Sequence, residues 1–131
     1  IIINGGITDV EQVKHHLKKT DGVMIGRSAY HTPYILAEIE KEIFNNKNVP
    51  SRQDVIEQLI PYVKNELKKG TRLNQIMRHT LGLFHGQSGA SHWKRYLSEN
   101  MCVRDADVKK IDHIMDKIRY NNVDTSVGQS A

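Results

Sequence analysis

Two glycine-containing segments near the start of the sequence have the residue types of a phosphate site. The first is Asn4-Gly5-Gly6 and the second is Gly26-Arg27, and a short apolar run precedes each of them. Glycine at a tight turn lets backbone amides point at an anion, and the guanidinium group of Arg27 is a permanently charged fork that matches phosphate oxygens. This composition predicts one phosphate site shared by both segments, with turn glycines beside a surface arginine as the plain alternative.

The apolar runs in front of these segments predict two strands. Residues 1–3 and residues 22–26 are short, apolar and bounded by glycine, which is typical of parallel strands that are buried on both faces. A TIM (β/α)8 barrel often carries its phosphate site after strands seven and eight, and a complete barrel needs about 250 residues. Because the chain has only 131 residues, we expect residues 1–44 to be the last two strand–helix units of a truncated barrel.

Polar residues predict where helices begin after each of these strands. Thr8 and Glu11 have the spacing of a capping box for a helix that follows the first strand. Thr32-Pro33 has the composition of the N-cap and first residue of a second helix. The hydroxyl groups of Thr8 and Ser28 are further candidate donors to a phosphate. Strand and helix alternate in this part of the chain, so it is predicted to be α/β.

Only helical patterns follow residue 50. The polar segment 45–50 predicts a linker, and apolar residues then recur with helical spacing through residues 51–120. Pro61 predicts a kink or a break in the first helix, and the polar residues 121–131 predict a disordered tail. The predicted fold class is α/β followed by all-α. The second part is expected to be a bundle of about four helices, over residues 51–70, 71–86, 89–98 and 105–118.

Positive charge is concentrated in the predicted helical part. The net charge of the chain is +4, and residues 64–95 contain seven lysines and arginines against the single acidic residue Glu66. Such a cluster predicts a polyanionic partner such as nucleic acid, although a solvated lysine-rich helix face has the same composition. Trp93 follows the spacing of buried residues, so we expect it in the core. The candidate contacts to nucleic acid are Arg78, His92, Lys94 and Arg95.

The cysteine count, the lengths of the apolar runs and the histidine spacing limit the environments and the kinds of site that the sequence supports. The single cysteine, Cys102, excludes a disulfide within the chain and fits a reducing cytoplasm. No apolar run approaches the roughly 20 residues of a membrane-spanning helix. His15 and His16 are adjacent and point to different faces of a helix, and no other spacing in the sequence predicts a metal site.

The segments described above resemble one known family, the tRNA-dihydrouridine synthases. Residues 4–7 and 21–33 are similar to the end of the barrel in that family. Residues 78–86 and 89–99 are similar to the helical domain of the subfamily that acts on uridines 20 and 20a. The resemblance extends over residues 1–120, so it links the predicted barrel units and the predicted helical domain in one family.

This resemblance implies an enzyme that uses flavin mononucleotide (FMN) and NADPH to reduce a uridine in the D-loop of tRNA to 5,6-dihydrouridine. It implies that residues 51–120 bind tRNA. The family's proton-donating cysteine lies in an Asn-Pro-x-Cys-Pro-like motif on an earlier barrel loop, and Cys102 has no such context. We therefore expect no catalytic residue in this chain and no activity from it alone. The residues that the resemblance assigns to the FMN phosphate are Asn4, Gly5, Gly6, Gly26 and Arg27.

Two other functions stay open at this point. A free-standing basic helical module could bind RNA without a barrel. Another FMN phosphate-binding barrel, such as a relative of dihydroorotate dehydrogenase, could carry the same glycines, although the basic helical part argues against it. Strand–helix units and the cysteine motif upstream of Ile1 would distinguish a synthase from the module.

Overall fold

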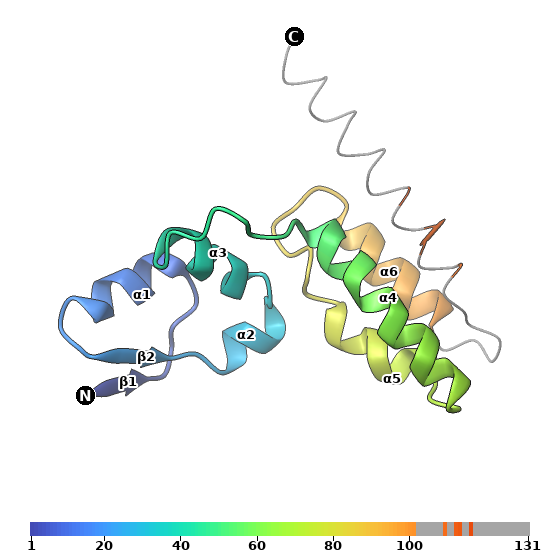
Figure 1. Ribbon diagram of the computed structural model, residues 1–131, viewed down its shortest axis with the longest axis horizontal. Coiled ribbons are helices and arrows are strands. Elements are labelled where there is room, and N and C mark those ends of the chain that lie inside the picture. The colour runs from blue at the N-terminus through green and yellow to red at the C-terminus, as the bar shows by residue number, and fades with distance from the viewer. Residues whose placement is uncertain (102–108, 110–111, 114–115, 117–131) are drawn as a thin grey trace, which may run out of the picture. The chain divides into compact units, whose positions relative to one another are not determined.

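The computed structural model describes residues 1–101, 109, 112, 113 and 116. The chain divides into two compact units, Ile1–Ser51 and Arg52–Ala131. Among the described residues, strands occur only in the first unit, and helices alone form the regular structure of the second (Figure 1). The predicted change from α/β to all-α is therefore confirmed. The predictions that lie wholly or mostly outside the described residues are the helix 105–118, the thiol of Cys102 and the tail 121–131.

The first unit is built around a parallel pair of strands. β1 (Ile2–Asn4) pairs with β2 (Gly22–Met24), with Ile3 opposite Val23. The connection between them contains α1 (Val10–Leu17), which contacts β2 (Figure 1). Because the strands are parallel, their carboxyl ends lie at the same edge of the sheet.

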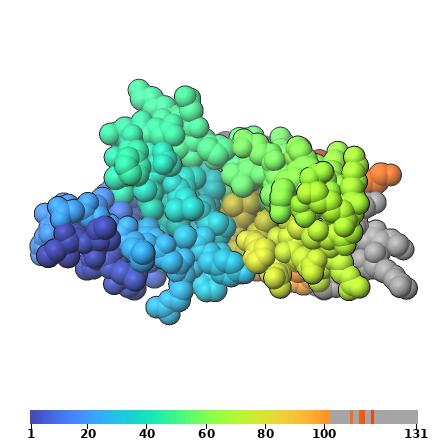
Figure 2. Space-filling view, turned by 60° about the horizontal axis from the view of Figure 1, so that its bottom comes forward, coloured from blue at the N-terminus to red at the C-terminus, as the bar shows by residue number. Residues whose placement is uncertain are grey.

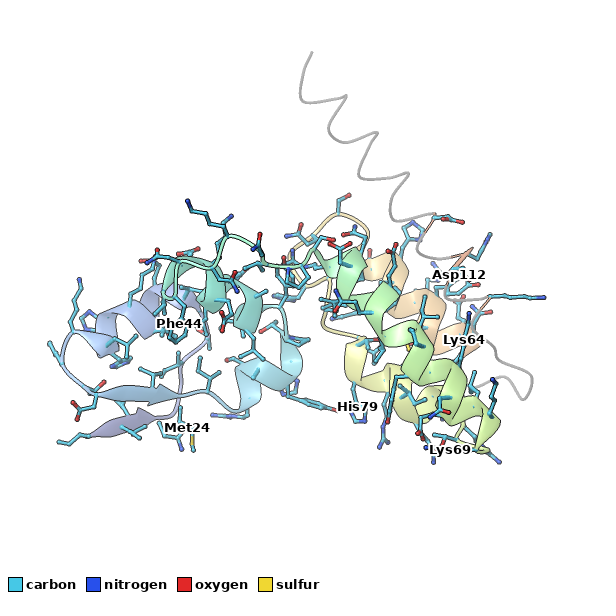
Figure 3. All side chains as sticks on the ribbon, in the orientation of Figure 1. Met24, Phe44, Lys64, Lys69, His79 and Asp112 are labelled. Atoms are coloured by element: carbon cyan, nitrogen blue, oxygen red, sulfur yellow. The ribbon has the colours of Figure 1, made fainter. Side chains whose placement is uncertain are left out.

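The two strands are less buried than the sequence predicts. Ile2 is 70% exposed and Met24 is 56% exposed. Figure 3 shows the Met24 side chain on the side of the strands away from α1, and the first residues, in dark blue, are uncovered in Figure 2. The burial on both faces that is typical of strands in a whole barrel is absent from this unit, because two strands with one covering helix leave the second face and the strand edges open.

The helices after β2 are divided differently from the prediction. α3 (Ile35–Glu42) forms where the helix beginning at Thr32-Pro33 was expected, and α2 (Arg27–His31), which was not predicted, precedes it. The backbone N–H and the hydroxyl of Thr32 both donate to the carbonyl oxygen of Ser28, each at 2.9 Å. Thr32 therefore closes α2, and its side chain does not cap α3. The buried apolar core of this unit consists of Ile7, Val10, Val13 and Ile35.

Helix α1 is capped one residue later than predicted. The carboxylate of Asp9 accepts a hydrogen bond from the backbone N–H of Gln12 at 2.8 Å, and the Gln12 side chain accepts one from the N–H of Thr8 at 2.9 Å. Glu11 pairs with Lys14 at 3.0 Å and does not reach back to the cap. A charged carboxylate accepts more strongly than a hydroxyl and suits the positive end of a helix, so Asp9 displaces Thr8 as the cap.

Up to residue 101, the second unit contains three α-helices and one short 3-10 helix. Pro61 lies inside the first of them without interrupting it, so the predicted break is wrong. The first two α-helices lie side by side on the surface that Figure 2 draws. The four-helix bundle stays a prediction. The elements are α4 (Arg52–Lys68), α5 (Leu73–Met77), η1 (Arg78–Thr80) and α6 (Ala90–Asn100).

Trp93 lies in the core of the second unit, as predicted. Its side chain is fully buried, and its ring centroid lies 5.0 Å from that of Phe84. The indole N–H donates to the carbonyl oxygen of Thr80 at 2.8 Å. In a continuous α-helix that carbonyl would accept from the N–H of Phe84, four residues on. In the structure this carbonyl accepts from the indole and from the N–H of Leu83, only three residues on, at 3.0 Å, so the α-helical pattern does not continue here. The single helix predicted over residues 71–86 is therefore wrong: α5 ends at Met77 and η1 follows it.

A hydrogen-bonded carboxylate holds the turn between α4 and α5. Glu66 accepts from the hydroxyl of Thr71 at 3.0 Å and from the ammonium group of Lys69 at 3.3 Å. Both contacts favour the ionised carboxylate, the bond from Thr71 most, so the pKa of Glu66 lies below its ordinary value. The backbone between them passes through Gly70 at a φ of +91°, which favours glycine.

Acid is expected to weaken this turn. Because the pKa of Glu66 is lower in the folded chain than in the unfolded chain, its contribution to stability is present above the unfolded pKa and is lost as the pH falls through the folded pKa. The urea midpoint of wild type should therefore fall more between neutral and acid pH than that of Thr71→Ala, which lacks the main bond. Ser91→Ala, an exposed uncharged change, should keep the wild-type profile. Identical profiles for wild type and Thr71→Ala would contradict this role of Glu66.

Candidate functional site

The carboxyl ends of β1 and β2 bring the two glycine-containing segments to one edge of the first unit. Asn4 lies opposite Met24 in the parallel register, so the residues that follow them leave the sheet at the same end (Figure 1). The hydroxyl of Ser28 donates to the carbonyl oxygen of Ile7 at 2.5 Å and ties the second loop to the first. Ligands of open parallel sheets bind at this edge. The predicted site residues at this edge are Asn4, Gly5, Gly6, Gly26 and Arg27.

The backbone of the first loop is open to a ligand and depends on glycine. Gly5 has a φ of +110° and Gly6 a φ of +69°, a region that side chains rarely adopt. A Cβ atom added to Gly5, Gly6 or Gly26 would meet no heavy atom within 4 Å. The residues Asn4 and Arg27 are exposed at the same edge. Loop amides and a guanidinium group can together bind a phosphate here.

Two hydroxyl groups that the sequence offers as phosphate donors are engaged within the unit. Ser28 uses its O–H in the tie between the loops, and the hydroxyl of Thr8 donates to the side-chain oxygen of Gln12 at 3.5 Å. The carboxylate of Asp9 occupies the N-terminus of α1. An anion at this edge therefore depends on loop amides and on Arg27. Sequence reasoning missed the role of Ser28, because no local pattern signals a bond between residues 21 positions apart.

The candidate nucleic-acid contacts of the second unit do not share one face. Arg78, His92, Lys94 and Arg95 are all exposed. On α6, His92 and Arg95 lie three residues apart on one flank, whereas Lys94 lies about 200° around the helix from His92 at 3.6 residues per turn. Arg95 also pairs with Glu99 at 3.0 Å. The charges on α6 thus form two separate surfaces, and a single positive groove does not follow from them.

The sequence matches known proteins along most of its length. A family model for dihydrouridine synthases matches residues 1–119. The chain belongs to the dihydrouridine synthase family. It is 49% identical over 107 residues to the tRNA-dihydrouridine(20/20a) synthase of Synechocystis sp., with 81% of this chain and 32% of that protein covered. The proteins of the same name from Shewanella oneidensis and Escherichia coli strain K12 are 45% and 46% identical, over 97% and 86% of this chain and 37% and 33% of their own lengths.

These matches confirm that the chain resembles the tRNA-dihydrouridine synthases, and in particular the 20/20a subfamily, as its sequence motifs indicate. Membership of the dihydrouridine synthase family argues against an unrelated RNA-binding module and against a different flavin barrel. The chain spans about a third of the length of the curated relatives it matches, from 31% to 38% in the examples compared. Within the described part of the chain, each helix is too short or too polar to cross a membrane.

Proposed function

We propose that this chain is the C-terminal part of an FMN-dependent enzyme that reduces uridine to 5,6-dihydrouridine in the D-loop of tRNA, with NADPH as the reductant. The observation that carries the proposal is the pair of loops tied by Ser28 at the carboxyl edge of β1 and β2, in a member of the dihydrouridine synthase family. As the last two strands of a barrel, β1 and β2 would present this edge at the barrel mouth. The name of the relatives, tRNA-dihydrouridine(20/20a) synthase, supports uridines 20 and 20a as the substrates.

The residues of this edge fit the phosphate of FMN. The open backbone at Gly5, Gly6 and Gly26 leaves room for phosphate oxygens to approach the amides, and the exposed guanidinium of Arg27 balances their charge. The side chain of Asn4 adds an amide donor at the end of β1. FMN, when bound, supplies hydride transfer, and the part of this chain is to hold and orient its phosphate.

The second unit supplies affinity for tRNA in this proposal. Its candidate contacts are exposed and cationic or ionisable, as contacts to the phosphate backbone require. His92 and Arg95 lie on one flank of α6 and Lys94 lies on the other, so the two flanks would contact different phosphates. Arg78 on η1 is a further candidate contact. Such contacts fix the position of the tRNA and contribute little sequence selectivity.

The chain by itself is expected to be inactive. Its single cysteine, Cys102, lacks the sequence context of the family's proton donor, so the reacting uridine would have no acid. Since tRNA modification by a protein of this family is a reaction of the cell interior, we also propose a cytoplasmic location.

The test compares this chain with the full-length synthase in cells that lack their own tRNA-dihydrouridine synthases. Mass spectrometry of the tRNA measures dihydrouridine at positions 20 and 20a. The full-length protein should restore it, whereas this chain should not and should purify without flavin absorbance. A full-length protein that leaves these uridines unreduced would overturn the proposed function, and stoichiometric flavin in this chain alone would overturn its expected inactivity.

A further inference from the structure

One face of α2 carries three exposed side chains of the kinds that bind nucleotides. Arg27, Tyr30 and His31 follow the i, i+3, i+4 spacing that puts residues on one helix face, and all three are exposed. Tyr30 is 56% exposed, and its ring centroid lies 5.5 Å from that of His31, with the ring planes 76° apart. The edge-on imidazole therefore supports the phenol ring at the surface.

Four hydrogen bonds hold this face at the carboxyl edge of the strands. The N–H of Tyr30 donates to the carbonyl oxygen of Gly26 at 3.3 Å, and Thr32 closes the helix on Ser28. Ser28 in turn binds the loop that follows β1, through Ile7. The phenol ring is thus carried by a short element that is anchored to both loops of the candidate phosphate site.

We propose that Tyr30, supported by His31, stacks on a nucleobase of the RNA strand that carries the reacting uridine. This inference rests on the proposed function. A base that reacts must leave its stack, so its neighbours in the strand lose a stacking partner. Exposed aromatic rings replace such partners in proteins that read single-stranded RNA.

The experiment uses the full-length synthase and compares Tyr30→Ala with Tyr30→Phe. Steady-state kinetics with tRNA, the flavin content per polypeptide and the dissociation constant for tRNA are measured for each variant. We expect Tyr30→Ala to raise KM and the dissociation constant for tRNA roughly tenfold, the size expected for one lost base–aromatic stack, with kcat and flavin content unchanged. Tyr30→Phe keeps the ring and should stay near wild type. Phe44→Ala is the matched control, because Phe44 is a similarly exposed aromatic residue of the same unit, at 68%, labelled in Figure 3.

The remaining outcomes would overturn either the stacking contact or the proposed reaction. Unchanged KM and tRNA affinity in Tyr30→Ala would overturn the stacking contact, as would an equal loss in Tyr30→Phe, which would point to the hydroxyl. A loss of flavin or of thermal stability in Tyr30→Ala would overturn it in favour of a cofactor or packing role. A wild-type protein that binds tRNA through Tyr30 but makes no dihydrouridine would reject the proposed reaction and keep the contact.

Discussion

Replacing Trp93 by alanine is expected to lower the stability of the second unit by about 3–5 kcal/mol. The side chain is fully buried against Phe84, and truncating a buried tryptophan costs about 3–5 kcal/mol. A whole small domain is stable by only about 5–15 kcal/mol, so this single change removes a large fraction of the stability. Urea unfolding followed by far-UV circular dichroism measures the effect, because the substitution removes the only tryptophan of the chain.

Two further variants separate the contributions of the indole. Trp93→Phe keeps an aromatic ring beside Phe84 but loses the hydrogen bond to the carbonyl of Thr80, a loss worth about 1 kcal/mol in addition to the smaller ring. Tyr62→Ala removes an aromatic side chain that is 54% exposed and should change the stability by less than about 0.5 kcal/mol. If Trp93→Ala proved as stable as Tyr62→Ala, the core described for this unit would be wrong.

Replacing Arg27 by alanine in the full-length synthase is expected to weaken FMN binding by roughly 10- to 100-fold, since a hydrogen bond to a charged group contributes about 1.5–3 kcal/mol. Its guanidinium is exposed at the edge where the open backbone of Gly5 and Gly6 lies. Riboflavin has the same ring system but lacks the phosphate, so its affinity should not change. Equilibrium titration by flavin fluorescence measures both constants.

The matched control for Arg27 is Lys18→Ala, which removes an exposed cation of the same unit at the C-terminal end of α1. It should leave the affinity for FMN unchanged, because Lys18 leads into the amino-terminal end of β2, at the edge of the sheet opposite to the carboxyl ends of the strands. A parallel loss of FMN and riboflavin affinity in Arg27→Ala would assign the residue to the flavin ring or to folding. A loss of equal size in Lys18→Ala would indicate a general effect of charge.

Short-range patterns predict the site and the order of elements in the first unit. The apolar runs over residues 1–3 and 22–26 depend only on neighbouring residues, and both strands form there. Even so, Asp9 rather than Thr8 caps α1, because adjacent residues compete for the same amides and the better acceptor wins. Both strands are open on one face in this unit, because burial depends on which elements cover a sheet, and the residues of one strand do not determine that.

The sequence by itself determined the family, the change from α/β to all-α and the burial of Trp93, because motifs, helical periodicity and tight-turn glycines are local properties of the chain. Only the tertiary structure decided which atoms those residues contact. The bond from Ser28 to Ile7 and the bond from Trp93 to Thr80 join residues 21 and 13 positions apart. The first ties two loops into one edge, and the second joins α6 to the end of η1. Both depend on how segments distant in sequence meet, which no short pattern encodes.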